Sequence, residues 1–122
     1  MRKILVVEDD TTLREVYTMI LSRGPYKLDT AANGKEALEK CALTRYDLIL
    51  LDLMMPIMDG VGFLEHFAST TGTPPSKVII LSNLSSGQEL AQAMSLGAYK
   101  NLLKAELSPG QLLSTVLYEL EA

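Results

Sequence analysis

Short, uninterrupted runs of apolar residues recur along the chain and are separated by segments with a longer period. Runs of four large apolar residues occupy positions 4–7, 48–51 and 78–81. Such a run is typical of a strand buried on both faces of a parallel sheet. Residues 26–31 carry alternating polar residues, as expected of a strand near a sheet edge, and residues 102–103 form the centre of a short strand. The pattern therefore predicts five strands.

Apolar residues at intervals of three and four predict a helix after each strand. Five helices are expected: one capped by Thr11 or Thr12 and ended by Gly24–Pro25, one after the Asn33–Gly34 turn, one around Phe63, one opened by the capping-box spacing of Ser86–Glu89 and stopped by Gly97, and one begun by Ser108, Pro109 and Gln111. Residues 70–76 are expected to be a connection, because both sides of this segment belong to one alternating pattern.

Strands that alternate with helices imply right-handed crossovers and a parallel sheet with helices on both faces. The glycine fingerprints of dinucleotide and P-loop sites are absent after the first strand, where acidic residues stand instead. We therefore expect one domain over residues 1–122. Its expected fold is α/β, a flavodoxin-like, doubly wound sheet of five parallel strands in the order 2-1-3-4-5, with five helices.

Composition and charge narrow the function classes. The chain has 122 residues, a net charge of −4 and a single cysteine, Cys41. This charge gives no basic footprint for nucleic acid or an anionic membrane surface, and no apolar run approaches the roughly 20 residues that span a bilayer. One cysteine excludes an internal disulfide and favours a reducing compartment, and the helical setting of Cys41 favours a packing role. We expect a cytoplasmic protein that binds neither nucleic acid nor membrane.

Polar residues stand at the carboxyl ends of the predicted buried strands. They are Glu8 and Asp9, Asp52, Ser82 and Lys104. Because the carboxyl ends of parallel strands meet at one edge of a sheet, these residues are expected to converge. Each of them alone could be a loop cap or a solvated charge. Together, three carboxylates, a hydroxyl and a lysine suit a hard divalent cation and a phosphoryl group.

The motifs at these strand ends resemble those of the receiver domains of two-component response regulators. The matching segments are Val6–Asp10 for the acidic pair, Leu50–Pro56 with Asp59–Gly60 for the phosphoacceptor segment, Ile79–Ser82 for the switch hydroxyl and Leu102–Lys104 for the lysine. The resemblance covers the whole chain and implies a phosphorylation-dependent signalling switch.

The resemblance also implies a role for each residue. Asp52 would be the phosphorylated aspartate, with Ser82 and Lys104 holding the phosphoryl oxygens. Mg²⁺ would be bound by Asp9, Asp52 and the backbone carbonyl of Met54, with Glu8 acting directly or through water.

The expected partners follow from the same resemblance. A histidine kinase or a histidine phosphotransfer protein would supply the phosphoryl group from a phosphohistidine. An unidentified downstream protein or output domain would read the result. His66 falls on a short helix remote from the strand ends, so we do not expect it to be the donor.

Three positions depart from the family pattern. Asn101 stands three residues before the lysine, where the family usually has an aromatic switch residue. Ala105 replaces the usual proline after a cis bond; cis costs a non-proline residue about 2.5–4 kcal/mol, so the geometry at this bond is left open. Asn83 replaces a commonly small residue, and a larger side chain there would narrow the entrance for the phosphodonor.

Two other readings compete with the switch. A metal-dependent phosphatase or phosphotransferase would use Asp52 as its nucleophile, but the chain shows no cap domain and no second catalytic acid. We therefore expect no enzyme beyond self-catalysed phosphotransfer and autodephosphorylation. A receiver-like adaptor would act without phosphorylation; the intact acids, Ser82 and Lys104 weigh against it, whereas Asn101 leaves it open.

Overall fold

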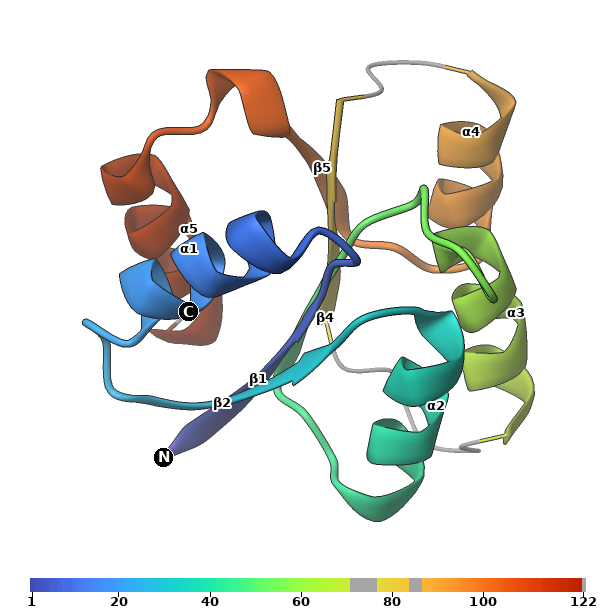
Figure 1. The fold of residues 1–122 in the computed structure, drawn as a ribbon, viewed down its shortest axis with the longest axis horizontal. Helices are drawn as coiled ribbons and strands as arrows, with labels where there is room; N and C mark the ends of the chain where they lie inside the picture. The colour runs from blue at the N-terminus through green and yellow to red at the C-terminus, as the bar shows by residue number, and fades with distance from the viewer. Residues whose placement is uncertain (71–76, 84–86, 122) are drawn as a thin grey trace.

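Five parallel strands form one sheet in the order β2-β1-β3-β4-β5, which confirms the expected topology (Figure 1). This computed structural model describes residues 1–70, 77–83 and 87–121. The strands are β1 (Arg2–Val7), β2 (Tyr26–Ala31), β3 (Leu48–Leu51), β4 (Lys77–Ser82) and β5 (Lys100–Leu103). The alternating segment at residues 26–31 is the edge strand β2, as its pattern predicts.

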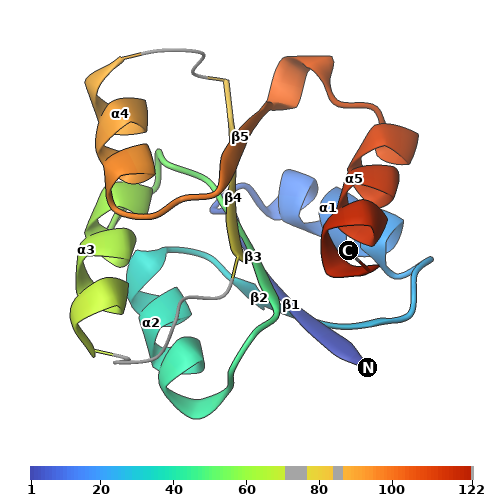
Figure 2. The ribbon, with the colours of Figure 1, turned by 180° about the vertical axis from the view of Figure 1, so that it is seen from behind.

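Helices cover both faces of the sheet. They are α1 (Thr11–Leu21), α2 (Gly34–Leu43), α3 (Gly60–Thr70), α4 (Gln88–Ser95) and α5 (Pro109–Glu121), with a short 3-10 helix, η1 (Lys104–Glu106). Helices α1 and α5 lie on one face, and α2, α3 and α4 lie on the other (Figures 1 and 2). This is the doubly wound arrangement that the strand and helix pattern predicts.

The helix caps agree with the sequence at some helices and differ at one. The expected cap of α1 at Thr11 or Thr12 is wrong, because Asp10 accepts a hydrogen bond from the N–H of Leu13 at 3.0 Å. An aspartate caps at least as well as a threonine, and here it stands one residue earlier. The expected box at α5 is confirmed: Ser108 Oγ accepts from the N–H of Gln111 at 3.1 Å, and Gln111 Oε1 accepts from the N–H of Ser108 at 2.9 Å.

Some expected features fall outside the described residues. Residues 71–76 of the expected connection and the expected cap Ser86 are among them. Helix α4 begins at Gln88 after Gly87 and is followed by Gly97, which has a φ of 109°. Because that φ is left-handed, it suits a glycine, and Gly97 stops the helix as expected.

The core lies on both sides of the central strand β3. Each residue of Leu48–Leu51 is at most 1% exposed, as a strand covered on both faces requires. Cys41 is half-buried and packs against the cluster beneath α2 and α3, and burial raises the pKa of its thiol to about 11. That thiol is therefore protonated near neutral pH, which agrees with a packing role. Among the described helices, we find none with the length and apolar character that a bilayer crossing requires.

Candidate functional site

The acidic residues begin where the central strands end. In the β1–β3 register Val7 lies beside Leu51, and the N–H of Asp52 donates to the carbonyl of Val7 at 3.0 Å. Glu8 and Asp52 are buried, 2% and 6% exposed, whereas Asp9 is exposed. Ligand oxygens of Glu8, Asp9 and Asp52 all lie within 4.8 Å of one another. The predicted convergence of the three carboxylates is therefore present in the structure.

Lys104 brings a positive charge to these carboxylates from the end of the outer strand β5. It follows β5, which is separated from β1 by β3 and β4. Its Nζ lies 2.5 Å from Glu8 Oε1 and 3.4 Å from Asp52 Oδ2. Lys104 therefore connects the ends of three strands through one ammonium group.

Burial and charge set the protonation of this pair. Burial raises the pKa of Glu8, and the Asp52 charge adds to the rise, while Lys104 and the N–H of Asp10 oppose it. Burial lowers the pKa of Lys104, but its hydrogen bond to Glu8 and the two carboxylate charges outweigh burial, so that pKa is raised. The site therefore keeps Lys104 positively charged, and burial disfavours the ionised form of Glu8.

A close backbone contact holds the loop after Asp52. The N–H of Gly60 donates to the carbonyl of Leu53 at 3.0 Å. A Cβ at Gly60 would lie 2.6 Å from the Asp52 carbonyl oxygen, so glycine is needed for this approach. Met54 lies in the same loop with an exposed side chain, and its N–H points to Asp52 Oδ1 at 3.4 Å. The start of α3 thus holds the backbone that carries Asp52 and Met54.

Arg14 supports the acidic residues from α1, and the sequence analysis did not identify it. Its Nη1 donates to the carbonyl of Glu8 at 2.7 Å and to that of Asp9 at 3.4 Å. The Glu8 side chain also accepts from the N–H of Asp10 at 3.1 Å. A lone arginine on a helix has no local signal for such a contact, because the contact depends on how α1 packs against the end of β1.

Ser82 is the last residue of β4 and carries its hydroxyl next to β5. Ser82 is 2% exposed, and its Oγ donates to Asn101 Oδ1 at 3.2 Å. Asn101, noted in the sequence as a departure, therefore contacts the predicted switch hydroxyl directly. Ser82 and Asn101 lie on neighbouring strands, since Ser82 pairs with Leu103.

The other residues singled out from the sequence lie around or away from the site. His66 is exposed on α3, and its Nδ1 lies 2.8 Å from the Gly62 carbonyl, so the structure does not bring it to the carboxylates. Asn83 is exposed directly after Ser82. The bond between Lys104 and Ala105 is trans, which answers the question that the sequence left open.

The donor set at this edge fits Mg²⁺. Carboxylate oxygens are hard ligands, and Glu8, Asp9 and Asp52 offer them within a few ångströms. A divalent cation would also offset the negative charge that Lys104 neutralises only in part. The residues present are therefore compatible with a magnesium site.

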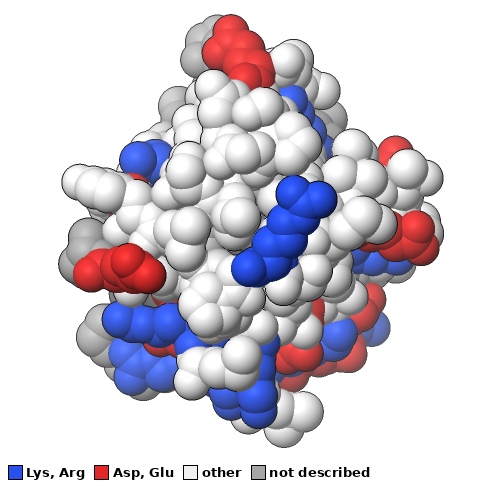
Figure 3. All heavy atoms as spheres, turned by 90° about the vertical axis from the view of Figure 1, so that its left-hand side faces the viewer, with Lys and Arg blue, Asp and Glu red and all other residues white. Residues whose placement is uncertain are grey.

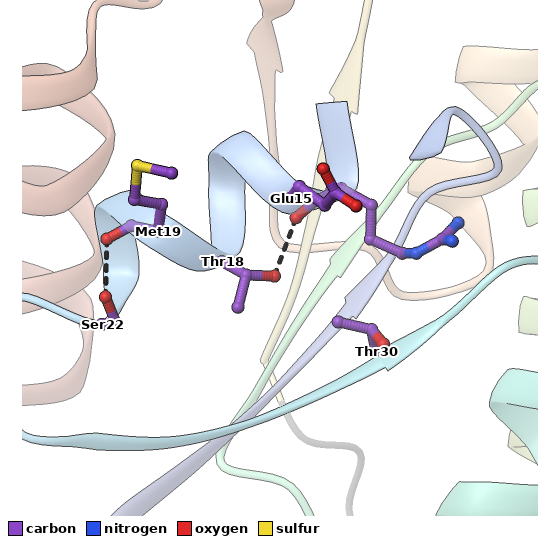
Figure 4. A pocket seen from close by; sticks show the side chains of 6 residues that line it. Glu15, Thr18, Met19, Ser22 and Thr30 are labelled. Atoms are coloured by element: carbon purple, nitrogen blue, oxygen red, sulfur yellow. Dashed lines mark hydrogen bonds between the residues drawn. The ribbon is translucent and has the colours of Figure 1, made fainter. Parts of the chain in front are cut away.

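A groove between α1 and β2 is distinct from this cluster. Its volume is about 440 Å³, and it is lined by Arg14, Glu15, Thr18, Met19, Ser22 and Thr30 (Figure 4). None of the three clustered carboxylates lines it. The hydroxyls of Thr18 and Ser22 donate to backbone carbonyls of α1, so they are engaged within their own helix (Figure 4).

The outer face over α1 and α5 carries few charges. Much of it is uncharged in Figure 3, and basic side chains gather toward its lower end. Val16, Met19 and Tyr118 are exposed apolar or aromatic residues of these two helices.

Comparisons with known proteins agree on one family. The model of the response regulator receiver domain matches residues 4–117. The transcriptional regulatory protein ResD of Bacillus subtilis is 46% identical over 72 residues, which cover 59% of this chain and 30% of ResD. A protein-glutamate methylesterase/protein-glutamine glutaminase of Myxococcus xanthus is 36% identical over 121 residues, covering 97% of this chain and 33% of that protein. The chain thus spans about a third of the length of these relatives.

Solved structures show the same similarity over the whole chain. The chemotaxis response regulator CheY4 of Vibrio cholerae has a TM-score of 0.87 and 29% identity, covering 98% of both chains. A CheY-like response regulator receiver domain protein of Methanospirillum hungatei has a TM-score of 0.89 and 27% identity, covering 99% of this chain and 94% of the other.

Proposed function

The chain belongs to the family of response regulator receiver domains of two-component signalling, and from this we propose a specific reaction at Asp52. Asp52 takes a phosphoryl group from the phosphohistidine of a histidine kinase or a histidine phosphotransfer protein, in a Mg²⁺-dependent reaction. The phosphorylated domain then changes its contacts with a downstream protein or output domain.

One observation carries this proposal: Lys104 and the carboxylates of Glu8 and Asp9 meet around Asp52, although these residues come from three separate segments of the chain. The distances are 3.4 Å from Lys104 Nζ to Asp52 Oδ2, and at most 4.8 Å among ligand oxygens of Glu8, Asp9 and Asp52. A structural ion pair needs one acid and one base, whereas a cluster with excess acids suits a bound cation.

The chemistry requires a carboxylate that can reach a phosphorus atom. An Asp52 oxygen forms a new bond to phosphorus, the phosphorus–nitrogen bond to the donor imidazole breaks, and the imidazole leaves with the electron pair. The ammonium of Lys104 and the hydroxyl of Ser82 stabilise the negative oxygens of the transferring group. Arg14 and Gly60 hold the backbone from which Glu8 and Asp52 project.

The metal would be held by Glu8, Asp9, Asp52 and the backbone carbonyl of Met54. When bound, Mg²⁺ supplies positive charge next to the phosphoryl oxygens. The lysine by itself leaves a net negative site, which would repel an incoming phosphoryl group.

The wider context is part of the same proposal. Residues 1–122 act as one receiver unit in the cytoplasm, without a nucleic-acid or membrane surface of their own. Its catalysis is limited to its own phosphorylation and dephosphorylation. The activities named for the longer relatives are those proteins' own.

Mass spectrometry of the intact protein tests the assignment. Incubation with a small acyl phosphate and Mg²⁺ is expected to add one phosphoryl group, and chelation of the metal is expected to prevent it. Asp52→Asn should remain unmodified. Asp47→Asn is a matched control, because Asp47 directly precedes the same strand, at the end opposite to Asp52.

Two results would count against the proposal. Equal labelling of Asp52→Asn would move the phosphoacceptor to another residue. Failure of the unmodified protein to take up phosphate from both an acyl phosphate and a phosphohistidine donor would instead favour an adaptor that acts without phosphorylation.

A further inference from the structure

Asn101 occupies the place of an aromatic switch residue but makes a polar contact. In the β4–β5 register Asn101 lies beside Ile80, which packs in the cluster on the side of α2, α3 and α4. Ser82 lies two residues after Ile80, so its side chain faces the same side of the sheet. The contact between Ser82 and Asn101 therefore forms on the face that α4 covers.

The hydroxyl of Ser82 has one proton to donate. Ser82 is 2% exposed, and a buried hydroxyl is normally held by a protein partner. Here the proton is donated to Asn101 Oδ1 at 3.2 Å. While that bond exists, the same proton cannot be donated to a group on Asp52.

We propose that Asn101 is a positioning residue that latches the Ser82 hydroxyl in the unphosphorylated domain. This rests on the proposed phosphorylation of Asp52. A phosphoryl oxygen is a charged acceptor and forms the stronger hydrogen bond, so the Ser82 hydroxyl donates to it instead of to the neutral amide oxygen of Asn101. Asn101 then loses its bond to Ser82, and the signal passes through a hydrogen bond instead of the movement of an aromatic ring.

The position of Asn101 indicates where the structure responds when its hydrogen bond to Ser82 breaks. Its strand leads to Lys104 three residues later, and its side chain lies on the face that α4 covers. Asn101 is partly buried, and breaking its bond to Ser82 removes one of its contacts on that face. The rearrangement is therefore expected on the α4 side of the sheet.

A double-mutant cycle tests the latch. Beryllofluoride with Mg²⁺ serves as the phosphoryl probe, and its apparent affinity is measured by NMR titration. Asn101→Ala removes the competing acceptor and is expected to tighten binding about fivefold, because an ordinary hydrogen bond changes such an equilibrium by roughly two- to tenfold. In a Ser82→Ala background the same substitution is expected to give no gain.

The matched control is Gln92→Ala, which removes an exposed amide from α4. It should leave the affinity unchanged. A second measurement needs no variant: the side-chain amide signals of Asn101 in the unmodified protein should shift when beryllofluoride binds. Thermal melts establish that each variant is folded.

Three results would overturn the latch. They are an Asn101→Ala variant that binds no more tightly, an equal gain in the Ser82→Ala background, and unmoved Asn101 amide signals. Each of these leaves the proposed function intact if the unmodified protein still binds the probe at Asp52. Failure of the unmodified protein to bind it would overturn the proposed function together with the latch.

Discussion

Lys104 contacts two buried carboxylates, and its loss would leave both without their nearest positive charge. The side chain of Lys104 is 13% exposed, and those of Glu8 and Asp52 are 3% and 8% exposed. Water therefore does little to screen these charges. Removing one partner of a buried pair costs more than the pair contributes, because the remaining charge is left uncompensated.

We expect Lys104→Met to destabilise the metal-free domain by about 3 kcal/mol at pH 7. The pKa of Glu8 is already raised by burial, and loss of the lysine raises it further. A carboxyl whose pKa is higher in the folded state favours folding below its unfolded pKa near 4.5, and this contribution is lost as pH rises through the folded pKa. The destabilisation should therefore be smaller at pH 5 than at pH 7.

Urea unfolding in chelator at both pH values measures this difference. Lys35→Met, at an exposed position on α2, is the control and should change stability little. Equal destabilisation by Lys104→Met at the two pH values would show that Glu8 is not the group left uncompensated.

At the scale of elements, Glu119 of α5 forms ion pairs with the first residues of two strands. These residues lie at the end of the sheet opposite to the acidic cluster. Glu119 is 3% exposed, and its carboxylate lies 3.1 Å from Lys100 Nζ and 3.4 Å from Lys77 Nζ. Lys77 begins β4 and Lys100 begins β5. Burial raises the pKa of Glu119, but the hydrogen bonds and charges of the two lysines outweigh it, so the pKa is lowered.

Glu119→Gln is expected to destabilise the domain by about 2 kcal/mol at pH 7, since it replaces charge-assisted hydrogen bonds with neutral ones. The lysines are about 40% exposed, so water recovers part of the loss. A lowered carboxyl pKa favours folding above its unfolded value near 4.5, and this contribution is lost as pH falls through the folded pKa. The cost of the substitution should therefore shrink below pH 4.5.

Urea denaturation midpoints of both proteins across this pH range measure the contribution of the Glu119 ion pairs. Glu121→Gln, at an exposed position on the same helix, should show neither the cost nor the pH dependence. A cost for Glu119→Gln that persists unchanged in acid would indicate lost packing instead of lost charge.

For the whole molecule, the acidic edge opposes folding until a cation binds. Two carboxylates about 5 Å apart repel by roughly 3 kcal/mol at an effective dielectric constant near 20, and Lys104 offsets part of this. A cation that binds only the folded state stabilises it by mass action. The same residues are thus expected to lower stability without metal and to raise it with metal.

We expect Asp52→Ala to raise the melting temperature without metal by about 4 °C, which corresponds to about 1 kcal/mol for a domain of this size. It should also reduce the further increase on adding Mg²⁺. Thermal melts in chelator and in Mg²⁺ measure both effects, with Glu39→Ala, at an exposed position on α2, as the control. A lower melting temperature without metal and a full Mg²⁺ increment would show that these carboxylates do not share a cation site.

The sequence by itself determined the elements and the edge at which the polar residues meet. Apolar runs specify buried strands, because a strand covered on both faces accepts apolar side chains on both sides. Parallel strands present their carboxyl ends on one side, so Glu8, Asp52, Ser82 and Lys104 could be grouped before any distance was known. The box at Ser108 was predictable for a similar reason, since it depends on residues three positions apart.

Tertiary structure alone decided which distant side chains touch. Arg14 reaches the carbonyl of Glu8, Ser82 donates to Asn101, and Glu119 meets two lysines 19 and 42 residues away. These contacts depend on strand register, helix packing and side-chain direction, none of which leaves a local pattern in the chain. A periodic pattern is repeated over many residues, whereas a single long-range contact rests on one pair that only the folded chain brings together.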